Sequence, residues 1–406
     1  MTRDNVIDAA FRVWGQEFYK TTSLTTLAGT LQVSKPALYR HFPSKQALLQ
    51  AMEERFYDDY AAAFTPALRE ILENRNWQER LLAIVRFIAG YFAHHLNYLI
   101  YFLIQFHSSN KEPRFRIAQA MAKRGLHFTE PAFRSPTDRQ YPPALVLAGI
   151  TAIYEVAEFH RRRYGLNGTE KGCSAVQPPK EEPSEEEIRS FAESVANKVR
   201  SGLLFDPARI NAISLEKLEA LHPASHTPPN PLLKAVAEVV AEEGLWKASM
   251  ETVAKRSGLS KSGLYAHFKS KKDMLSRFFM AEFEHIAECT TTRIAMSGLR
   301  EERLYLAILS IAEYLKARPE LLVAMDWVRI QRLELNISLP PALYDFFNDL
   351  KPERSSGDIW ENIPLWIPFL LAILLIRLKK LPELDYKSLR KMYKFICLGI
   401  KGLDNN

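Results

Sequence analysis

The sequence repeats a block of 28 residues, and this repeat limits the possible folds more than any other feature. Residues 22–49 return as residues 248–275 without a gap, 226 positions later, and 12 of the 28 aligned positions are identical. An internal repeat of this length indicates that one structural unit occurs twice. Because 406 residues suffice for two domains with cores of their own, we expect two similar halves.

The positive charge of the chain is concentrated in the two copies. The sequence carries a net charge of +7, from 54 Lys and Arg against 47 Asp and Glu. Residues 1–50 contribute +3 and residues 230–279 contribute +4, so these two blocks account for the whole excess. A basic surface confined to a repeated unit is typical of a protein that meets phosphate groups.

The bulk composition is that of a globular protein. Hydrophobic residues make up 47% and charged residues 25% of the sequence, which argues against long disordered regions. The three cysteines are too far apart to suggest a disulfide framework or a metal site, and the N-terminus lacks the apolar core of a signal peptide. We therefore expect a cytoplasmic protein without metal or other cofactor.

Apolar periodicity predicts an all-α chain, without the alternation of a sheet. Each copy begins with an amphipathic helix, followed by a short helix capped by Ser23 or Ser249, a tight turn, and a second short helix capped by Ser34 or Ser260. Further helices are expected at about 44–63, 77–95, 97–108, 113–125, 143–164, 184–204, 270–297, 300–317, 320–335, 340–350, 359–380 and 385–402.

These helices group into four domains and a linker. We expect a first helix-turn-helix domain at 1–49, a first helical core at 50–221, a linker at 222–231, a second helix-turn-helix domain at 232–275 and a second helical core at 276–406. The linker contains four prolines and is too short to separate the halves widely. Residues 165–184 are rich in Gly, Pro and charge and predict a mobile loop.

A helix-turn-helix places its second helix in the major groove of DNA, where each base pair presents a distinct hydrogen-bonding pattern. Leu38 and Phe42, like Leu264 and Phe268, lie four residues apart and are expected to anchor that helix to its own core. The candidates for DNA contact are the capping serines and the polar, small and basic residues around the second helix of each copy. They are Ser23, Ser34, Lys35, Ala37, Tyr39, Arg40, His41 and Lys45, and Ser249, Ser260, Lys261, Ser262, Gly263, Tyr265, His267 and Lys271.

The same residues resemble a known family. The pattern Val33-Ser34-Lys35-x-x-Leu38-Tyr39-x-His41-Phe42-x-Ser44-Lys45, and its second copy from Leu259 to Lys271, are similar to the N-terminal DNA-binding domain of the TetR family of transcriptional regulators. The resemblance covers about 50 residues in each half. It implies that Tyr, His and the following Lys touch phosphates or base edges. It also implies a four-helix dimer interface and a small molecule whose binding changes the spacing of the two DNA-binding domains, the reading heads.

Ordinary members of the family are homodimers, and each half of this chain carries what one subunit would supply. The helices expected at 143–164 and 184–204 correspond in order to those at 359–380 and 385–402. The resemblance therefore implies two tandem TetR-like units that form an intramolecular pseudo-dimer, monomeric as a chain, with reading helices about 34–36 Å apart.

The two copies differ where they would read DNA. Three aligned positions differ: Pro36, Ala37 and Arg40 against Ser262, Gly263 and Ala266. At the turn, Gln32 stands where the second copy has the usual glycine, Gly258, and a left-handed conformation costs a non-glycine residue about 1 kcal/mol.

We predict a sequence-specific transcriptional regulator, a repressor released by a small-molecule inducer, which binds double-stranded DNA at an imperfect palindrome.

Other interpretations stay open. In one, a single head contacts DNA and the other is a structural mimic. In another, the apolar stretch Ile363–Ile376 makes the protein a membrane-associated sensor, although its 14 residues fall short of the about 20 that a span needs, so a buried helix is favoured. The aromatic segment Tyr91–Phe106 fits a ligand pocket or simple packing, so no ligand residues are assigned. No set of residues suggests catalysis, and we expect no enzyme.

Overall fold

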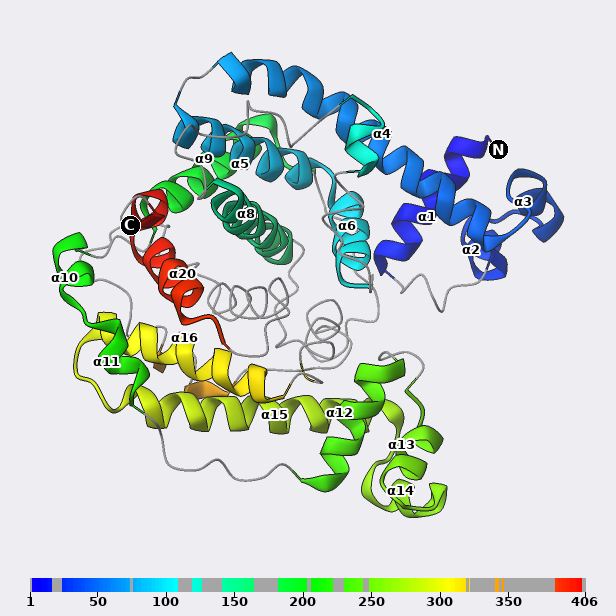
Figure 1. Cartoon of the computed structure of the whole chain (residues 1–406). Helices are drawn as coiled ribbons and strands as arrows, with labels where there is room; N and C mark the ends of the chain where they lie inside the picture. Colours follow the sequence, from blue (N-terminus) through cyan, green and yellow to red (C-terminus); the bar gives the residue numbers. More distant parts are fainter. Residues whose placement is uncertain are drawn as a thin grey trace. The chain divides into compact units, whose positions relative to one another are not determined.

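The structure is a computed structural model, and it describes residues 2–16, 24–73, 76–108, 119–125, 141–163, 182–202, 206–221, 230–243, 248–318, 321, 340–342, 345–346 and 384–403. Within these ranges every regular element is a helix, as the sequence predicts. The chain divides into two compact units, Met1–Ala196 and Asn197–Asn406, with the boundary inside helix α9. Figure 1 labels the helices of both units.

The first unit is built around three long helices that carry a smaller group of helices at its N-terminal end. Its elements are α1 (Arg3–Gln16), α2 (Leu24–Thr30), α3 (Lys35–His41), α4 (Lys45–Glu73), α5 (Trp77–His94), α6 (Leu96–Ser108), α8 (Tyr141–Arg163) and most of α9 (Glu185–Ser201). Helix α4 packs on α1 and α5, and α5 packs on α6 and α8. Aromatic rings fill the space between them: the ring centroid of Phe56 lies 5.5 Å from that of Tyr98 and 5.3 Å from that of Tyr101.

Helix α4 ends ten residues further along the chain than the sequence predicts. It runs through Pro66 to Glu73, instead of ending near residue 63. Proline lacks the backbone N–H of a regular helical residue and usually interrupts a helix. Here Phe64 and Ile71 are buried on either side of Pro66, so packing maintains the helix across it.

The second unit contains two short connecting helices, a second small group and three longer helices. Its elements are the end of α9, α10 (Pro207–Ala212), α11 (Leu215–Glu219), α12 (Pro231–Glu243), α13 (Met250–Arg256), α14 (Lys261–His267), α15 (Lys271–Ile294), α16 (Arg300–Ala317), α20 (Tyr386–Leu398) and the 3-10 helix η2 (Gly399–Leu403). Helix α15 packs along α16, and α16 contacts α11 and α20. Figure 1 shows α12, α13 and α14 at one end of α15.

Helices α10 and α11 are not among the expected elements. Arg390 of α20 pairs with Glu216 of α11 and holds Glu219 by an Nη2–Oε2 hydrogen bond of 2.5 Å. The hydroxyl of Tyr305 donates to the same Glu219 carboxylate at 2.5 Å. These contacts come from α16 and α20, which lie far along the chain, so local sequence patterns do not predict α11.

The end of α9 meets the end of α20 through backbone atoms in the second unit. Gly202 and Gly399, which follow these two helices, have φ angles of 61° and 65°. A Cβ at Gly202 would lie 2.4 Å from the nitrogen of Gly399, and a Cβ at Gly399 would lie 2.3 Å from the carbonyl oxygen of Arg200. Only glycine satisfies both the conformation and the close approach.

Several expectations fall outside the described residues. They include the first half of the helix at 113–125, most of the helices at 320–335 and 340–350, the helix at 359–380, nearly all of the loop at 165–184, most of the linker, and Ile363–Ile376. The expected domain boundaries stay a prediction. Among the helices that the structure describes, none combines the length and the apolar character needed to cross a membrane.

Candidate nucleic-acid interface

The structure places a group of short helices before each long helix α4 and α15. We call α1, α2, α3 and the start of α4 the first head, and α12, α13, α14 and the start of α15 the second head. In each head the middle helix packs on the one that follows it, α2 on α3 and α13 on α14. The helices α3 and α14 both have seven residues and end directly before Phe42 and Phe268.

Buried anchors and serine caps fix α3 and α14 in the same way. Leu38 and Leu264 are completely buried, as the sequence predicts. The hydroxyl of Ser34 accepts a hydrogen bond from the backbone nitrogen of Ala37 at 3.3 Å, and that of Ser260 accepts one from Gly263 at 3.0 Å. These bonds satisfy backbone donors that a helix N-terminus leaves free. Both expected caps are therefore confirmed.

The opposite face of α3 and α14 is open to solvent. The exposed fractions of Tyr39 and Tyr265 are 40% and 48%, which is high for large aromatic side chains. Arg40 and His267 are exposed, and His41 is half-buried. The ammonium group of Lys35 lies 5.8 Å from the ring centroid of Tyr39, within the range of a cation–π contact. The rings therefore stand on the side that does not pack on the protein.

Lys45 and Lys271 are the first residues of the long helices that follow. Both are half-buried, and burial lowers the pKa of each ammonium group from its ordinary value. A cation at a helix N-terminus faces the positive end of the helix dipole, which is unfavourable unless an anion is close. A DNA phosphate at either position would meet both a lysine and the first backbone N–H groups of a helix.

The turn before α3 and α14 has the left-handed residue that the sequence predicts. Gln32 has a φ angle of 53° and Gly258 has one of 71°. A Cβ added at Gly258 would meet no atom within 4 Å, so the first head can hold glutamine at the aligned position at the cost of backbone strain alone.

Different ion pairs hold the first helix of each head. In the first head, Arg55 of α4 pairs with Asp4 of α1 and lies 3.6 Å from Asp8. In the second head, Arg256 of α13 pairs with Glu242 of α12 at 2.5 Å. The two heads thus share the geometry of the reading helix but not the polar contacts that support it.

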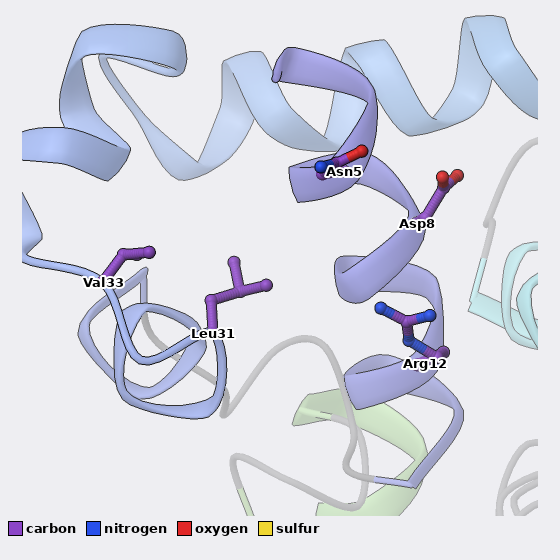
Figure 2. A pocket seen from close by; sticks show the side chains of 5 residues that line it. All are labelled: Asn5, Asp8, Arg12, Leu31 and Val33. Carbon is purple, nitrogen blue, oxygen red and sulfur yellow. The ribbon is translucent and has the colours of Figure 1, made fainter. Parts of the chain in front are cut away.

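The first head also has an open pocket between α1 and the turn after α2. Figure 2 shows side chains of α1 on one side and of the turn on the other. The lining residues are Asn5, Asp8, Arg12, Leu31 and Val33. None of them is a predicted DNA contact, and the pocket separates the polar face of α1 from the apolar turn.

Comparison with known proteins assigns both heads to one family. The family of bacterial regulatory proteins called tetR matches residues 6–52 and again residues 232–278. These two segments are 226 positions apart at both ends, as in the sequence repeat, and they contain α3 and α14. The chain carries two tandem TetR N-terminal domains.

Curated regulators match parts of the chain. The transcriptional regulator YuxN of Bacillus subtilis is 40% identical over 53 residues, 13% of this chain and 18% of that protein. The transcriptional activator FasR of Mycolicibacterium smegmatis is 33% identical over 92 residues, 23% of this chain and 41% of that protein. The fatty acid metabolism regulator protein of Bacillus subtilis is 26% identical over 127 residues, 31% of this chain and 66% of that protein. The chain thus spans less than two thirds of the length of these curated relatives.

Solved structures match less than half of the chain, at low TM-scores. The fatty acid degradation regulator FadR of Bacillus halodurans has 16% sequence identity and a TM-score of 0.33, and the match covers 44% of this chain and 99% of that one. FadR of Bacillus subtilis, in complex with stearoyl-CoA, has 19% identity and a TM-score of 0.33, with 42% and 98% of the two chains covered.

The structure also describes most of the remaining predicted site residues. Ser249 caps α13, where its hydroxyl accepts from the backbone nitrogen of Thr252 at 3.0 Å. Ser262 and Lys261 are exposed. Ser23 lies outside the described residues. A Cβ added at Gly263 would lie 3.3 Å from the hydroxyl oxygen of Ser260. The aligned residue of the first head, Ala37, carries a Cβ. The hydrogen bond from its backbone nitrogen to Ser34 is 3.3 Å long, against 3.0 Å for the bond from Gly263 to Ser260.

Sequence reasoning missed one exposed residue beside the second reading helix. Leu259, directly before the capping Ser260, has an exposed fraction of 37%. Its aligned partner, Val33, is half-buried. An exposed apolar side chain here can contact the methyl group of a thymine or a sugar. The only sequence signal is its position before the cap, where the hydrophobic pattern suggests burial.

Proposed function

We propose that the protein is a cytoplasmic, sequence-specific DNA-binding regulator of transcription that uses both heads. The observation that carries this proposal is the repeated arrangement of α3 and α14, in which a buried leucine and a capping serine leave a tyrosine exposed on the outer face. The concentration of the net positive charge in the same two blocks supports it, because phosphate contacts supply much of the affinity for DNA.

The two heads read unequal half-sites in this proposal. The exposed Arg40 of α3 can pair with a guanine edge or a phosphate, whereas Ala266 at the aligned position of α14 lacks a donor. Conversely, Ser262 offers a hydroxyl where α3 has Pro36. An operator with two different half-sites, an imperfect palindrome, follows from these differences.

The two halves act as an intramolecular pseudo-dimer. The two tandem TetR domains support this part of the proposal, because each half of the chain carries what one subunit of a homodimer would supply. Linking the halves in one chain makes their association independent of protein concentration.

The regulator acts as a repressor that a small-molecule inducer releases. Two long helical regions follow the heads, and a ligand in either region can change the spacing of the heads that precede it. Among the curated relatives are both an activator, FasR, and a repressor, ComR of Escherichia coli. The sign of regulation is therefore tested by transcription in vitro, where addition of the protein to its own operator must lower the amount of transcript.

Selection of bound sequences from random DNA tests the proposal directly. We expect enrichment of one site with two unequal halves, protected over more than one DNA turn in a footprint. Light scattering of the full chain should give a mass near 46.6 kDa without DNA. Enrichment of a perfectly symmetric site would contradict the unequal half-sites, a mass of twice this value would contradict the self-contained pseudo-dimer, and failure to enrich any sequence would contradict specific DNA binding.

A further inference from the structure

The core of the second unit contains an arginine whose hydrogen-bonding capacity is only partly used. Arg293, near the end of α15, is 1% exposed, and its Nη1 atom pairs with the carboxylate of Glu313 on α16. Among the residues that the structure describes, its Nε and Nη2 atoms have no hydrogen-bond partner, and neither has the hydroxyl of Thr290, which lies one turn earlier and is completely buried. Three polar groups on one side of α15 are therefore buried and unsatisfied.

The unused atoms of Arg293 form one complete edge of the guanidinium group. The Nε–H and one Nη2–H bond of arginine are parallel, and together they bind the two oxygens of a carboxylate. Buried donors are normally satisfied by protein, by water or by a ligand, because an unsatisfied donor loses its bonds to water without replacement. An entire open edge beside a free hydroxyl is suited to an oxygen-bearing ligand.

The charge of Arg293 is also incompletely neutralised inside the protein. The side chain of Glu313 is 27% exposed, so water solvates part of its charge, and its other oxygen accepts from the hydroxyl of Tyr386 at 3.3 Å. The other buried pair in this unit differs. Both Nη atoms of Arg318 bond to the buried carboxylate of Glu282 at 2.9 Å.

The first half of the chain shows that the fold does not need these polar groups. Helices α4 and α15 begin at the aligned Lys45 and Lys271, so the 226-residue offset of the repeat can be followed along them. Phe64 is aligned with Thr290, and Ala67 is aligned with Arg293. Phe64 is 1% exposed, so an apolar side chain fills this core position in the first unit. Since buried polar pairs often add little to stability, a different role accounts better for Thr290 and Arg293.

We infer that Arg293 and Thr290 bind the carboxylate group of a small apolar molecule, and that this is an effector subsite of the second unit. The open edge of Arg293 takes both carboxylate oxygens, and the hydroxyl of Thr290 donates to one of them. The flanking residues of α15 and α16, Ile286, Ile294 and Leu309, are buried and apolar, which suits an apolar body. The inference rests on the proposed ligand-responsive function and assigns the subsite to the second half alone.

Binding of matched acids and esters to the full chain tests the inference. Calorimetry is carried out with laurate, palmitate and benzoate, each beside its methyl ester, which keeps the apolar body and removes the charge. We expect at least one acid to bind and its ester not to bind. Thr290→Val should weaken binding of that acid about tenfold, because one hydrogen bond is lost, and Arg293→Met should abolish it.

A neighbouring threonine provides the matched control. The hydroxyl of Thr291 already donates to the carbonyl oxygen of Ala287 at 2.8 Å, so Thr291→Val makes the same chemical change away from the unsatisfied groups. The acid should bind this variant as it binds the unchanged chain. Should Arg293→Met not fold, the comparison of Thr290→Val with Thr291→Val decides alone.

The outcomes separate this inference from the proposed function. Absence of binding by all three acids, equal binding of an acid and its ester, or equal loss in Thr290→Val and Thr291→Val would each overturn the inference. Electrophoretic mobility shift with the selected operator is measured on the same samples. If the protein binds DNA but none of the acids, only the carboxylate subsite is refuted. If an acid binds in a way that needs Arg293 but the protein binds no DNA, only the DNA-binding function is refuted.

Discussion

A Cβ on Gly202 would lie 2.4 Å from the backbone nitrogen of Gly399, so the two chain segments touch through their backbones. Both glycines also have positive φ angles. Two independent constraints, conformation and space, therefore act on the same pair of residues. The contact holds the end of α9 against the end of α20 within the second unit.

Replacement of Gly202 or Gly399 by alanine is expected to destabilise the chain by about 2–4 kcal/mol, from backbone strain and steric overlap together. Gly258→Ala is the matched control, because Gly258 has a φ angle of 71° but no atom within 4 Å of the added Cβ. The control should cost only about 1 kcal/mol. Urea unfolding followed by circular dichroism measures all three, and an equal cost for Gly258→Ala and Gly399→Ala would show that the close contact contributes nothing.

Loss of either exposed tyrosine is expected to weaken operator binding. Tyr39→Ala and Tyr265→Ala should each cost about 1–3 kcal/mol, the usual range for a specific DNA contact. Met280→Ala is the control. It removes a side chain of similar exposure, 42%, from α15, outside the reading helix, and should leave the affinity for DNA unchanged. Fluorescence anisotropy with labelled operator gives the affinities. Wild-type affinity in one tyrosine variant would mean that this head does not contact DNA.

The lysines at the start of the reading helices are expected to set the salt dependence of DNA binding. Replacement of Lys35 or Lys261 by glutamine should lower the slope of log affinity against log salt by about 1, because each phosphate contact releases roughly one counterion. Lys387, which is exposed on α20, is the control, and Lys387→Gln should leave the slope unchanged. The same slope in all four proteins would place these lysines away from the phosphates.

The first unit is expected to lose stability in mild acid because of a buried histidine. The pKa of His160 is lowered from its ordinary value, chiefly by burial, and its Nε2 atom donates a hydrogen bond of 2.9 Å to the carbonyl oxygen of Phe92. The unfolded chain therefore binds more protons than the folded chain just below about pH 6.5, and stability falls as the pH decreases through this range.

Thermal unfolding at about pH 7.5 and about pH 5.5 measures this effect. His160→Gln, which keeps a donor for Phe92 and does not titrate, should reduce the difference between the two unfolding temperatures. The pKa of His95 is also lowered, by burial first and then by His94, so a part of the difference should remain. An unchanged difference in His160→Gln would contradict the assignment.

Most of both heads could be predicted from the sequence because their determinants are local. A capping serine, a leucine on the inner face and a left-handed turn residue act within a few positions of each other. Ser34, Ser260 and the positive φ angle of Gln32 therefore follow from short patterns, and the repeat provides an independent second copy of each.

The missed features depend on partners that lie far along the chain. Helix α11 is held by Arg390, 171 residues from Glu219, and the extension of α4 past Pro66 depends on buried neighbours. The polar position of Arg293 was missed for the same reason, since a single arginine near a helix C-terminus suggests a favourable surface charge. Only the three-dimensional structure shows that it is buried.

The presence of both TetR domains in one polypeptide has a genetic consequence. Separate subunits exchange between dimers, so a defective copy of an ordinary homodimer can inactivate the products of an intact gene. Here a damaged head always remains attached to the other head of the same molecule, 226 residues away. In the proposed pseudo-dimer, a cell with one normal and one mutated gene would therefore contain two separate populations of protein, and the mutation would behave as recessive.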